Sequence, residues 1–163
     1  MRLKGRVALV TGSTSGIGLG IARCLAAEGA DVALNGFGDA DAIEALRRGM
    51  EAEYGVRVTF APADIADAEA CAAMAEETRR RLGSLDILVN NAGIQATHPI
   101  EEFPIERWNQ VLAVDLSGAF YAMRAALPAM RGRGWGRVVN IASAHGLVAS
   151  AHKAAYVAAK HGL

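Results

Sequence analysis

The chain has 163 residues, 52% of them hydrophobic, which is enough material for one domain with a sizeable core. Lysine plus arginine and aspartate plus glutamate both number 17, and this balance predicts neither a nucleic-acid partner nor an anionic membrane surface. No apolar stretch reaches the ~20 residues of a membrane-spanning helix. We therefore expect a cytoplasmic protein whose cysteines, Cys24 and Cys71, stay reduced and semi-buried and hold no metal.

The first predicted element is a strand near residues 6–10, followed by a glycine-rich turn and a helix near 17–28. Gly12 permits a tight turn, Gly16 lets the backbone approach a pyrophosphate, and Gly18 allows close packing of the helix. The helix N-terminus adds free N–H donors. We interpret the turn as a dinucleotide-binding loop, and a glycine turn without a ligand is the alternative. The residues expected to contact the cofactor are Gly12, Ser13, Thr14, Ser15, Gly16, Ile17 and Gly18.

The rest of the chain alternates apolar runs with amphipathic ones, which predicts an α/β fold with a doubly wound parallel sheet of the Rossmann type. Asp67 suits a helix N-cap, Pro104 a first helical turn, and Pro128 a kink or end of its helix. Further strands are expected at 31–35, 57–61, 86–90 and 136–142, and helices at 40–54, 67–82 and 104–131, with another starting near 154. Residues 1–163 form a single domain in this interpretation.

The end of the second strand bears on the choice of cofactor. The segment Asn35-Gly-Phe-Gly38 is followed by no lysine or arginine before Arg47, so a 2′-phosphate would lack a cation. Asp39 and Asp41 would repel it. These residues favour NAD over NADP, although the acidic residue that usually ends this strand is missing as well.

Tyr156 and Lys160 lie four residues apart in an alanine-rich segment, so a helix would place them on one face. The ammonium would favour the neighbouring phenolate, and such a tyrosine could exchange a proton with an alcohol near neutral pH. The pair alone also occurs by chance on surface helices.

Together with Asn90-Asn-Ala-Gly93 and Ser143, the glycine turn and the tyrosine–lysine pair resemble the short-chain dehydrogenases/reductases over the whole chain. The segments 35–38, 93–95 and 141–150 are similar to the members that act on D-3-hydroxybutyrate. The resemblance implies NAD-dependent hydride transfer between this hydroxy acid and acetoacetate. A 3-oxoacyl or other ketone reductase is the nearest alternative of the same class.

The resemblance also implies roles for individual residues. Tyr156 would take the hydroxyl proton, Lys160 would favour its phenolate and hold the nicotinamide ribose, and Ser143 would bond the reacting oxygen. The substrate carboxylate would meet donors from Gln95, His145 and Lys153, each of which could instead be an ordinary polar residue. The remaining cofactor contacts would come from Phe37, Asp64, Asn91, Ala92 and Gly93.

Asp115, three histidines and one arginine-containing segment have separate predictions. Asp115 stands where the family carries an asparagine of its catalytic set, and near Lys160 it would hold the lysine protonated. His98, His152 and His161 are expected at the surface. The segment 131–137, which contains three arginines, is expected to be a solvated connecting loop.

Members of the family are longer than this chain, and their sheet order is 3-2-1-4-5-6-7. The resemblance therefore implies a domain that is incomplete at its C-terminal edge, without the last two strands and the substrate-covering segment. Strand 136–142 would then be an exposed, aggregation-prone edge, and the final helix would be poorly fixed. A homotetramer is expected for the full-length family member, and a catalytically incompetent dinucleotide-binding remnant is the alternative for this chain.

Overall fold

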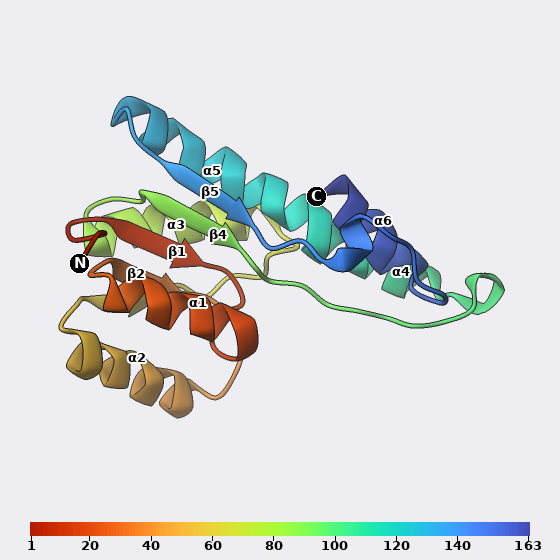
Figure 1. Cartoon of the computed structure of the whole chain (residues 1–163), viewed down its shortest axis with the longest axis horizontal. Coiled ribbons are helices and arrows are strands. Elements are labelled where there is room, and N and C mark those ends of the chain that lie inside the picture. Colours follow the sequence, from red (N-terminus) through yellow and green to blue (C-terminus); the bar gives the residue numbers. More distant parts are fainter.

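The computed structural model describes all residues from Met1 to Leu163 and contains one parallel five-stranded sheet in the order β3-β2-β1-β4-β5 (Figure 1). The order and all five predicted strands are confirmed. β5 pairs only with β4 and is largely exposed, as expected of an edge. The strands are β1 (Val7–Val10), β2 (Asp31–Leu34), β3 (Val58–Phe60), β4 (Ile87–Asn90) and β5 (Arg137–Asn140).

Helices cover both faces of the sheet, which explains why the strands are continuous apolar runs. On one face, α1 (Gly16–Ala27) and α2 (Ala40–Tyr54) pack over a core that includes Val10 and Leu34. On the other, α3 (Ala68–Leu82) and α5 (Gly118–Gly132) enclose a core around Leu9 and Leu88. No helix in the structure is both long enough and apolar enough to cross a bilayer.

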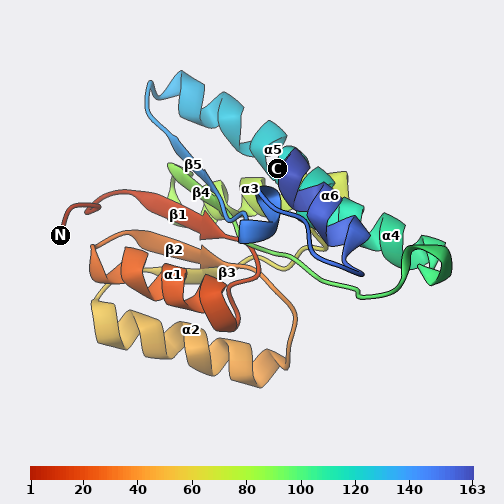
Figure 2. The same cartoon turned by 45° about the vertical axis from the view of Figure 1, so that its right-hand side comes forward.

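A third, smaller core lies beyond the carboxyl ends of the strands, where α4 (Ile105–Leu112) contacts α6 (Ala154–Gly162) (Figures 1 and 2). Its buried members are Val111, Ala155 and Ala159. The final helix is therefore packed on α4 rather than on the sheet. Short 3-10 turns, η1 (Ile100–Glu102) and η3 (Ala144–Gly146), lie in the loops that lead to these helices.

The predicted helix over 104–131 is confirmed as a continuous helical segment over residues 105–132, but it contains a π-helical turn that was not predicted. A π-helical turn, η2 (Ala113–Ser117), separates α4 from α5, and Pro104 precedes the first helical residue. Pro128 does not end its helix, which continues to Gly132. Pro128 and Arg124, whose carbonyl loses its partner at the proline, are both exposed, so water can satisfy that carbonyl.

The predictions for Asp67 and for the two cysteines have different outcomes. Asp67 is the N-cap of α3 as predicted, and its carboxylate accepts from two backbone N–H groups. The cysteines are not semi-buried: Cys24 is exposed on α1, whereas Cys71 is fully buried. Burial raises the pKa of the Cys71 thiol to about 11, which keeps it protonated and unreactive.

A buried carboxylate ties the amino ends of the strands together. Asp86 is 0% exposed, and its Oδ2 accepts from the Val7 N–H at 2.9 Å and from the Ser84 hydroxyl at 2.7 Å. Its Oδ1 lies 3.4 Å from Arg133 Nε and 3.7 Å from Arg6 Nη1. Arg133 belongs to the predicted solvated loop, so that loop does connect α5 to β5 but also contributes a structural contact.

Asp86→Ala should lower the free energy of unfolding by about 3 kcal/mol, because it leaves the buried Val7 N–H without an acceptor and two guanidinium groups without their anion. Urea denaturation measures the loss. Asp31→Ala is the control, since Asp31 pairs with a mostly exposed Arg57 and its removal should cost about 1 kcal/mol. Equal losses of unfolding free energy would show that Asp86 stabilises the fold no more than an exposed ion pair does.

Two glycines near the carboxyl end of β1 occupy positions where a side chain would collide with neighbouring atoms. Gly12 has φ +62°, and a Cβ there would lie 3.0 Å from the Cα of Ala92, which follows β4. A Cβ at Gly18 would overlap the carbonyl oxygen of Gly12 and the side-chain amide of Asn91. Gly18 therefore allows α1 to approach both its own turn and the β4 loop.

Gly18→Ala should destabilise the protein by about 2 kcal/mol through overpacking. Gly20 lies in the same helix with nothing within 4 Å of its added Cβ, so Gly20→Ala should instead stabilise by about 0.5 kcal/mol through helix propensity. Denaturation of the two variants side by side measures the difference. Similar changes in both would contradict the steric role of Gly18.

Candidate active site

The loops after β1 and β4 meet at the carboxyl edge of the sheet. Thr11 Oγ1 accepts from the N–H groups of Asn91 and Ala92, both at 3.0 Å. In return, the Asn91 side-chain amide donates to the carbonyl oxygens of Thr11, at 2.9 Å, and Gly12, at 3.1 Å. The two loops are therefore held in one rigid arrangement.

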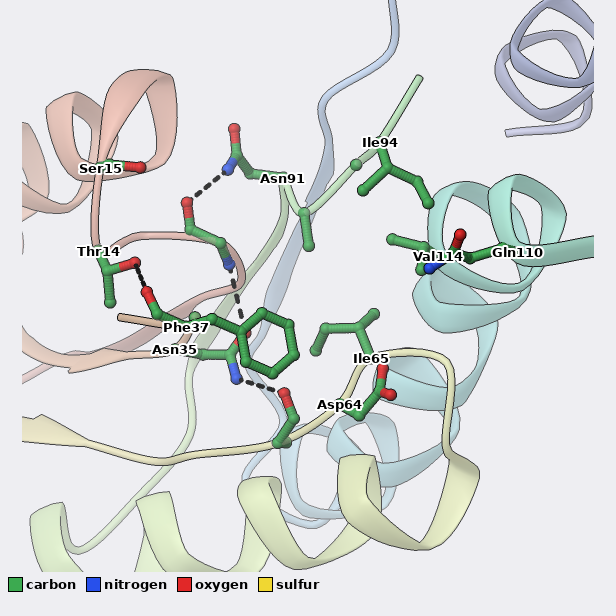
Figure 3. A pocket seen from close by; sticks show the side chains of 15 residues that line it. Thr14, Ser15, Asn35, Phe37, Asp64, Ile65, Asn91, Ile94, Gln110 and Val114 are labelled. Carbon is green, nitrogen blue, oxygen red and sulfur yellow. Dashed lines mark hydrogen bonds between the residues drawn. The ribbon is translucent and has the colours of Figure 1, made fainter. Parts of the chain in front are cut away.

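A cavity of about 480 Å³ opens beside this junction (Figure 3). Thr14 and Ser15 line it from the glycine turn, and Gln110 and Val114 line it from the opposite side. Eight of the residues predicted to contact a cofactor line it, and none of the lining residues is a lysine or arginine. The complete lining is Gly12, Thr14, Ser15, Asn35, Gly36, Phe37, Ala63, Asp64, Ile65, Asn91, Ala92, Gly93, Ile94, Gln110 and Val114.

The N-terminus of α1 supplies unoccupied donors at the side of this cavity. Ser15 is the N-cap residue, and its side chain makes no capping hydrogen bond. The first N–H groups of the helix have no intrahelical acceptor. Gly16, the first helical residue, has open space around its Cα. Such an end can hold the negative charge of a phosphate group.

Ser13 differs from the other residues predicted in the turn. It is completely buried, and its hydroxyl donates to the carbonyl of Val10 at 2.7 Å and accepts from the N–H of Asn35 at 3.0 Å. Its side chain points into the protein interior rather than into the cavity. The Thr14 hydroxyl donates to the Phe37 carbonyl at 3.0 Å, which joins the turn to the loop after β2.

A second cavity, of about 240 Å³, adjoins the first, with which it shares Asn91, Gly93 and Ile94. Tyr156 and Lys160 line it. The two cavities thus bring the glycine turn and the predicted acid–base pair to one continuous site. The complete lining is Ile17, Asn91, Gly93, Ile94, Gln95, Asp115, Ile141, Ala142, Tyr156 and Lys160.

Lys160 is held by groups from three segments. It is 6% exposed, its Nζ donates to the Ile141 carbonyl at 3.1 Å, and it lies 5.6 Å from the centroid of the Tyr156 ring. The predicted stacking of the two residues on one helix face is confirmed. Asp115 Oδ2 lies 3.5 Å from the same Nζ.

Asp115 links the π-helical turn to the β4 loop. It is 2% exposed, and its Oδ1 accepts from the Ile94 N–H at 2.7 Å. Burial raises the pKa of its carboxyl, while the Ile94 N–H and the Lys160 ammonium oppose the rise. The carboxylate is therefore near Lys160 but costly to bury.

Ser143 and His145 lie next to the second cavity without lining it. Ser143 is half-buried, and its Oγ accepts from the His145 N–H at 3.2 Å, so its hydroxyl proton remains free to be donated. The His145 ring meets the Tyr156 ring edge-on at 6.1 Å, and its buried Nδ1 has no partner.

The three predicted carboxylate-binding residues are not equally placed. Gln95 lines the second cavity, and His145 borders it through Tyr156. Lys153 is the residue before α6, and it lines neither cavity. The structure therefore brings Gln95 to the site and leaves Lys153 outside the lining of both cavities.

The expectation for the other histidines is partly wrong. His152 and His161 are exposed, but His98 is half-buried with its ring edge-on to Phe103 at 5.4 Å. Its backbone N–H donates to the His152 carbonyl at 2.9 Å, which joins the loop after β4 to the loop before α6.

Asn35 was not assigned a role from the sequence. Its Oδ1 accepts from the Gly12 N–H, and its amide donates to the carbonyls of Ala61 and Ala63, all at 3.2 Å. It thereby ties the glycine turn to the ends of β2 and β3. A polar residue directly after a buried strand was the signal that could have identified it.

Comparison with known proteins agrees with this geometry. Residues 6–163 match the model of the short chain dehydrogenase family. The chain is 55% identical, over 161 residues, to a D-beta-hydroxybutyrate dehydrogenase of Cupriavidus necator, and 51% identical, over 158 residues, to one of Rhizobium meliloti. These alignments cover 99% and 97% of this chain and 62% and 61% of the relatives, so the chain spans less than two thirds of their length.

A crystal structure of a putative short-chain alcohol dehydrogenase from Sinorhizobium meliloti has the same fold. It superposes with a TM-score of 0.93 at 36% identity, over 98% of this chain and 63% of the other. The matched family model, the identities and the shared fold lead to one conclusion. The chain belongs to the short chain dehydrogenase family.

Proposed function

We propose that the protein is an NAD-dependent oxidoreductase that interconverts D-3-hydroxybutyrate and acetoacetate. The observation that carries the proposal is the junction of two cavities, one beside the glycine turn and one lined by Tyr156 and Lys160. The substrate is inferred from the names of the two relatives at 55% and 51% identity.

The first cavity suits the adenosine and phosphate portions of a dinucleotide. The uncapped N-terminus of α1 can accept phosphate charge, Asp64 and Phe37 line the same cavity, and Ala92 and Gly93 form a side-chain-poor wall. Lys160 would hold the nicotinamide ribose from the second cavity. A bound nicotinamide would supply hydride chemistry, and the chain's own residues would bind it, orient it and handle the proton.

NAD suits the charges of this cavity better than NADP. No cation lines it, and Asp39, at the N-terminus of α2 just past the β2 loop, is an acid. An additional 2′-phosphate would meet negative charge without a counter-ion. Asn35 has both ends of its amide engaged with backbone groups, so it is not a free ribose ligand. The absence of a cation also disfavours an NADPH-using 3-oxoacyl or ketone reductase.

Proton transfer is assigned to Tyr156, which shares its cavity with the Lys160 ammonium. The ammonium stabilises the phenolate that accepts the substrate's hydroxyl proton. Ser143 is proposed to donate its free hydroxyl proton to the reacting oxygen. Gln95, His145 and Lys153 are proposed to bind the carboxylate. A cytoplasmic homotetramer is the form that we propose for the enzyme.

Tyr156→Phe should reduce NAD-dependent oxidation of D-3-hydroxybutyrate by at least about 100-fold, because it removes the acid–base hydroxyl and keeps the ring. NADH binding, followed by fluorescence, should persist. Tyr121→Phe on α5 is the matched control, since Tyr121 lines neither cavity. Near-normal turnover by Tyr156→Phe would overturn the assignment.

Alanine at Gln95, His145 or Lys153 should raise KM for hydroxybutyrate far more than it lowers kcat, because these side chains are assigned to the carboxylate rather than to the reacting oxygen. Butan-2-ol, which lacks a carboxylate, serves as the reference substrate. A loss of equal size on both alcohols would argue against this assignment for the residue concerned.

A further inference from the structure

Asp115 and Lys160 lie in the wall between two cavities. Both residues line the 240 Å³ cavity that contains Tyr156, and both line a void of about 10 Å³ on the side of Asn90. Gly93 passes over the pair so closely that a Cβ there would lie 3.0 Å from Asp115 Oδ2 and 3.5 Å from Lys160 Nζ. The two charges are therefore enclosed together next to the tyrosine.

Packing alone does not account for a carboxylate at this position. Its Oδ1 accepts from the Ile94 N–H, which a neutral amide oxygen would satisfy equally well. Its Oδ2 is buried, has no hydrogen-bond partner and is only within ion-pair distance of Lys160. Because burial raises the pKa of this carboxyl, the charge costs stability at neutral pH.

Few other charges act on the pair. Tyr156 is the only further titratable side chain that lines either cavity. η3 contributes His145, which faces the Tyr156 ring. The charged residues of α4, Glu106 and Arg107, are exposed, and so is His161 of α6. The β4 loop contributes His98, whose ring packs against Phe103, and η2 has no second titratable residue.

We propose that Asp115 is a positioning residue that sets the working pH of Tyr156, by partly neutralising the Lys160 ammonium that faces the tyrosine. The inference rests on the proposed function. A carboxylate at 3.5 Å from the ammonium reduces the positive potential that favours the phenolate. The tyrosine therefore becomes a base at a higher pH than it would beside an isolated lysine.

Asp115→Asn keeps the acceptor for Ile94 and removes the charge. The rising limb of kcat/KM against pH, for oxidation of D-3-hydroxybutyrate, should move to lower pH by at least about half a unit, which is about a threefold gain at pH values below the parent's midpoint. Activity at the optimum should be equal or higher.

Asp67→Asn is the matched control, because it removes the same charge from the N-cap of α3, where asparagine caps equally well. It should leave the pH profile unchanged. An active parent with identical profiles for Asp115→Asn would overturn this inference alone. A parent with no activity at any pH would instead contradict the proposed function.

Thermal unfolding tests the same coupling without activity. Since folding raises the pKa of Asp115, its stabilising contribution is complete below the unfolded pKa of about 3.9 and is lost as the pH rises through the folded pKa. Asp115→Asn should therefore gain more stability at pH 8 than at pH 4. The gain at pH 8 should be larger in a Lys160→Met background, where nothing offsets the buried charge. Equal gains in both backgrounds would show that the two charges are not coupled.

Discussion

The close approach of the loops after β1 and β4 is the constraint on which the site depends. Gly12 and Gly18 leave no room for a Cβ, and this allows Thr11 and Asn91 to exchange hydrogen bonds between the loops. The same contact places the open end of α1 beside one cavity and Gly93 over the ion pair in the other. A looser junction would separate the phosphate-accepting helix end from the tyrosine.

Two buried aspartates differ in their surroundings at the two ends of the sheet. Asp86 satisfies backbone and hydroxyl donors at the amino ends and has two partly exposed arginines to share its charge. Asp115, at the carboxyl ends, has one backbone donor and a single ammonium at 3.5 Å, and its Oδ2, like Oδ1 of Asp86, has no hydrogen-bond partner. The first arrangement stabilises the fold, whereas in the second burial raises the pKa of the Asp115 carboxyl, so that its charge costs stability.

Periodicity and turn chemistry predicted all five strands, because strands follow from short-range patterns, whereas the meeting of the glycine turn with Tyr156 and Lys160 was implied by the family resemblance. The π-helical turn could not be predicted in this way. It places Asp115 where its carboxylate meets the Ile94 N–H, a contact between segments that are distant in sequence. The role of Asn35 was not predicted for the same reason, since its partners lie on two other loops, those after β1 and β3.

The packing of α6 on α4 has a mechanical consequence. Tyr156 packs against a small core around Val111, Ala155 and Ala159, whereas the glycine turn connects β1 and α1, which both contribute to a large core on the sheet. The two halves of the site therefore belong to different packing units, which contact each other at the site. On warming, the contact between these two units should open before the sheet unfolds, so that the site is lost before the fold. A molecule long enough to contact both cavities would bind both units and raise the temperature at which they separate.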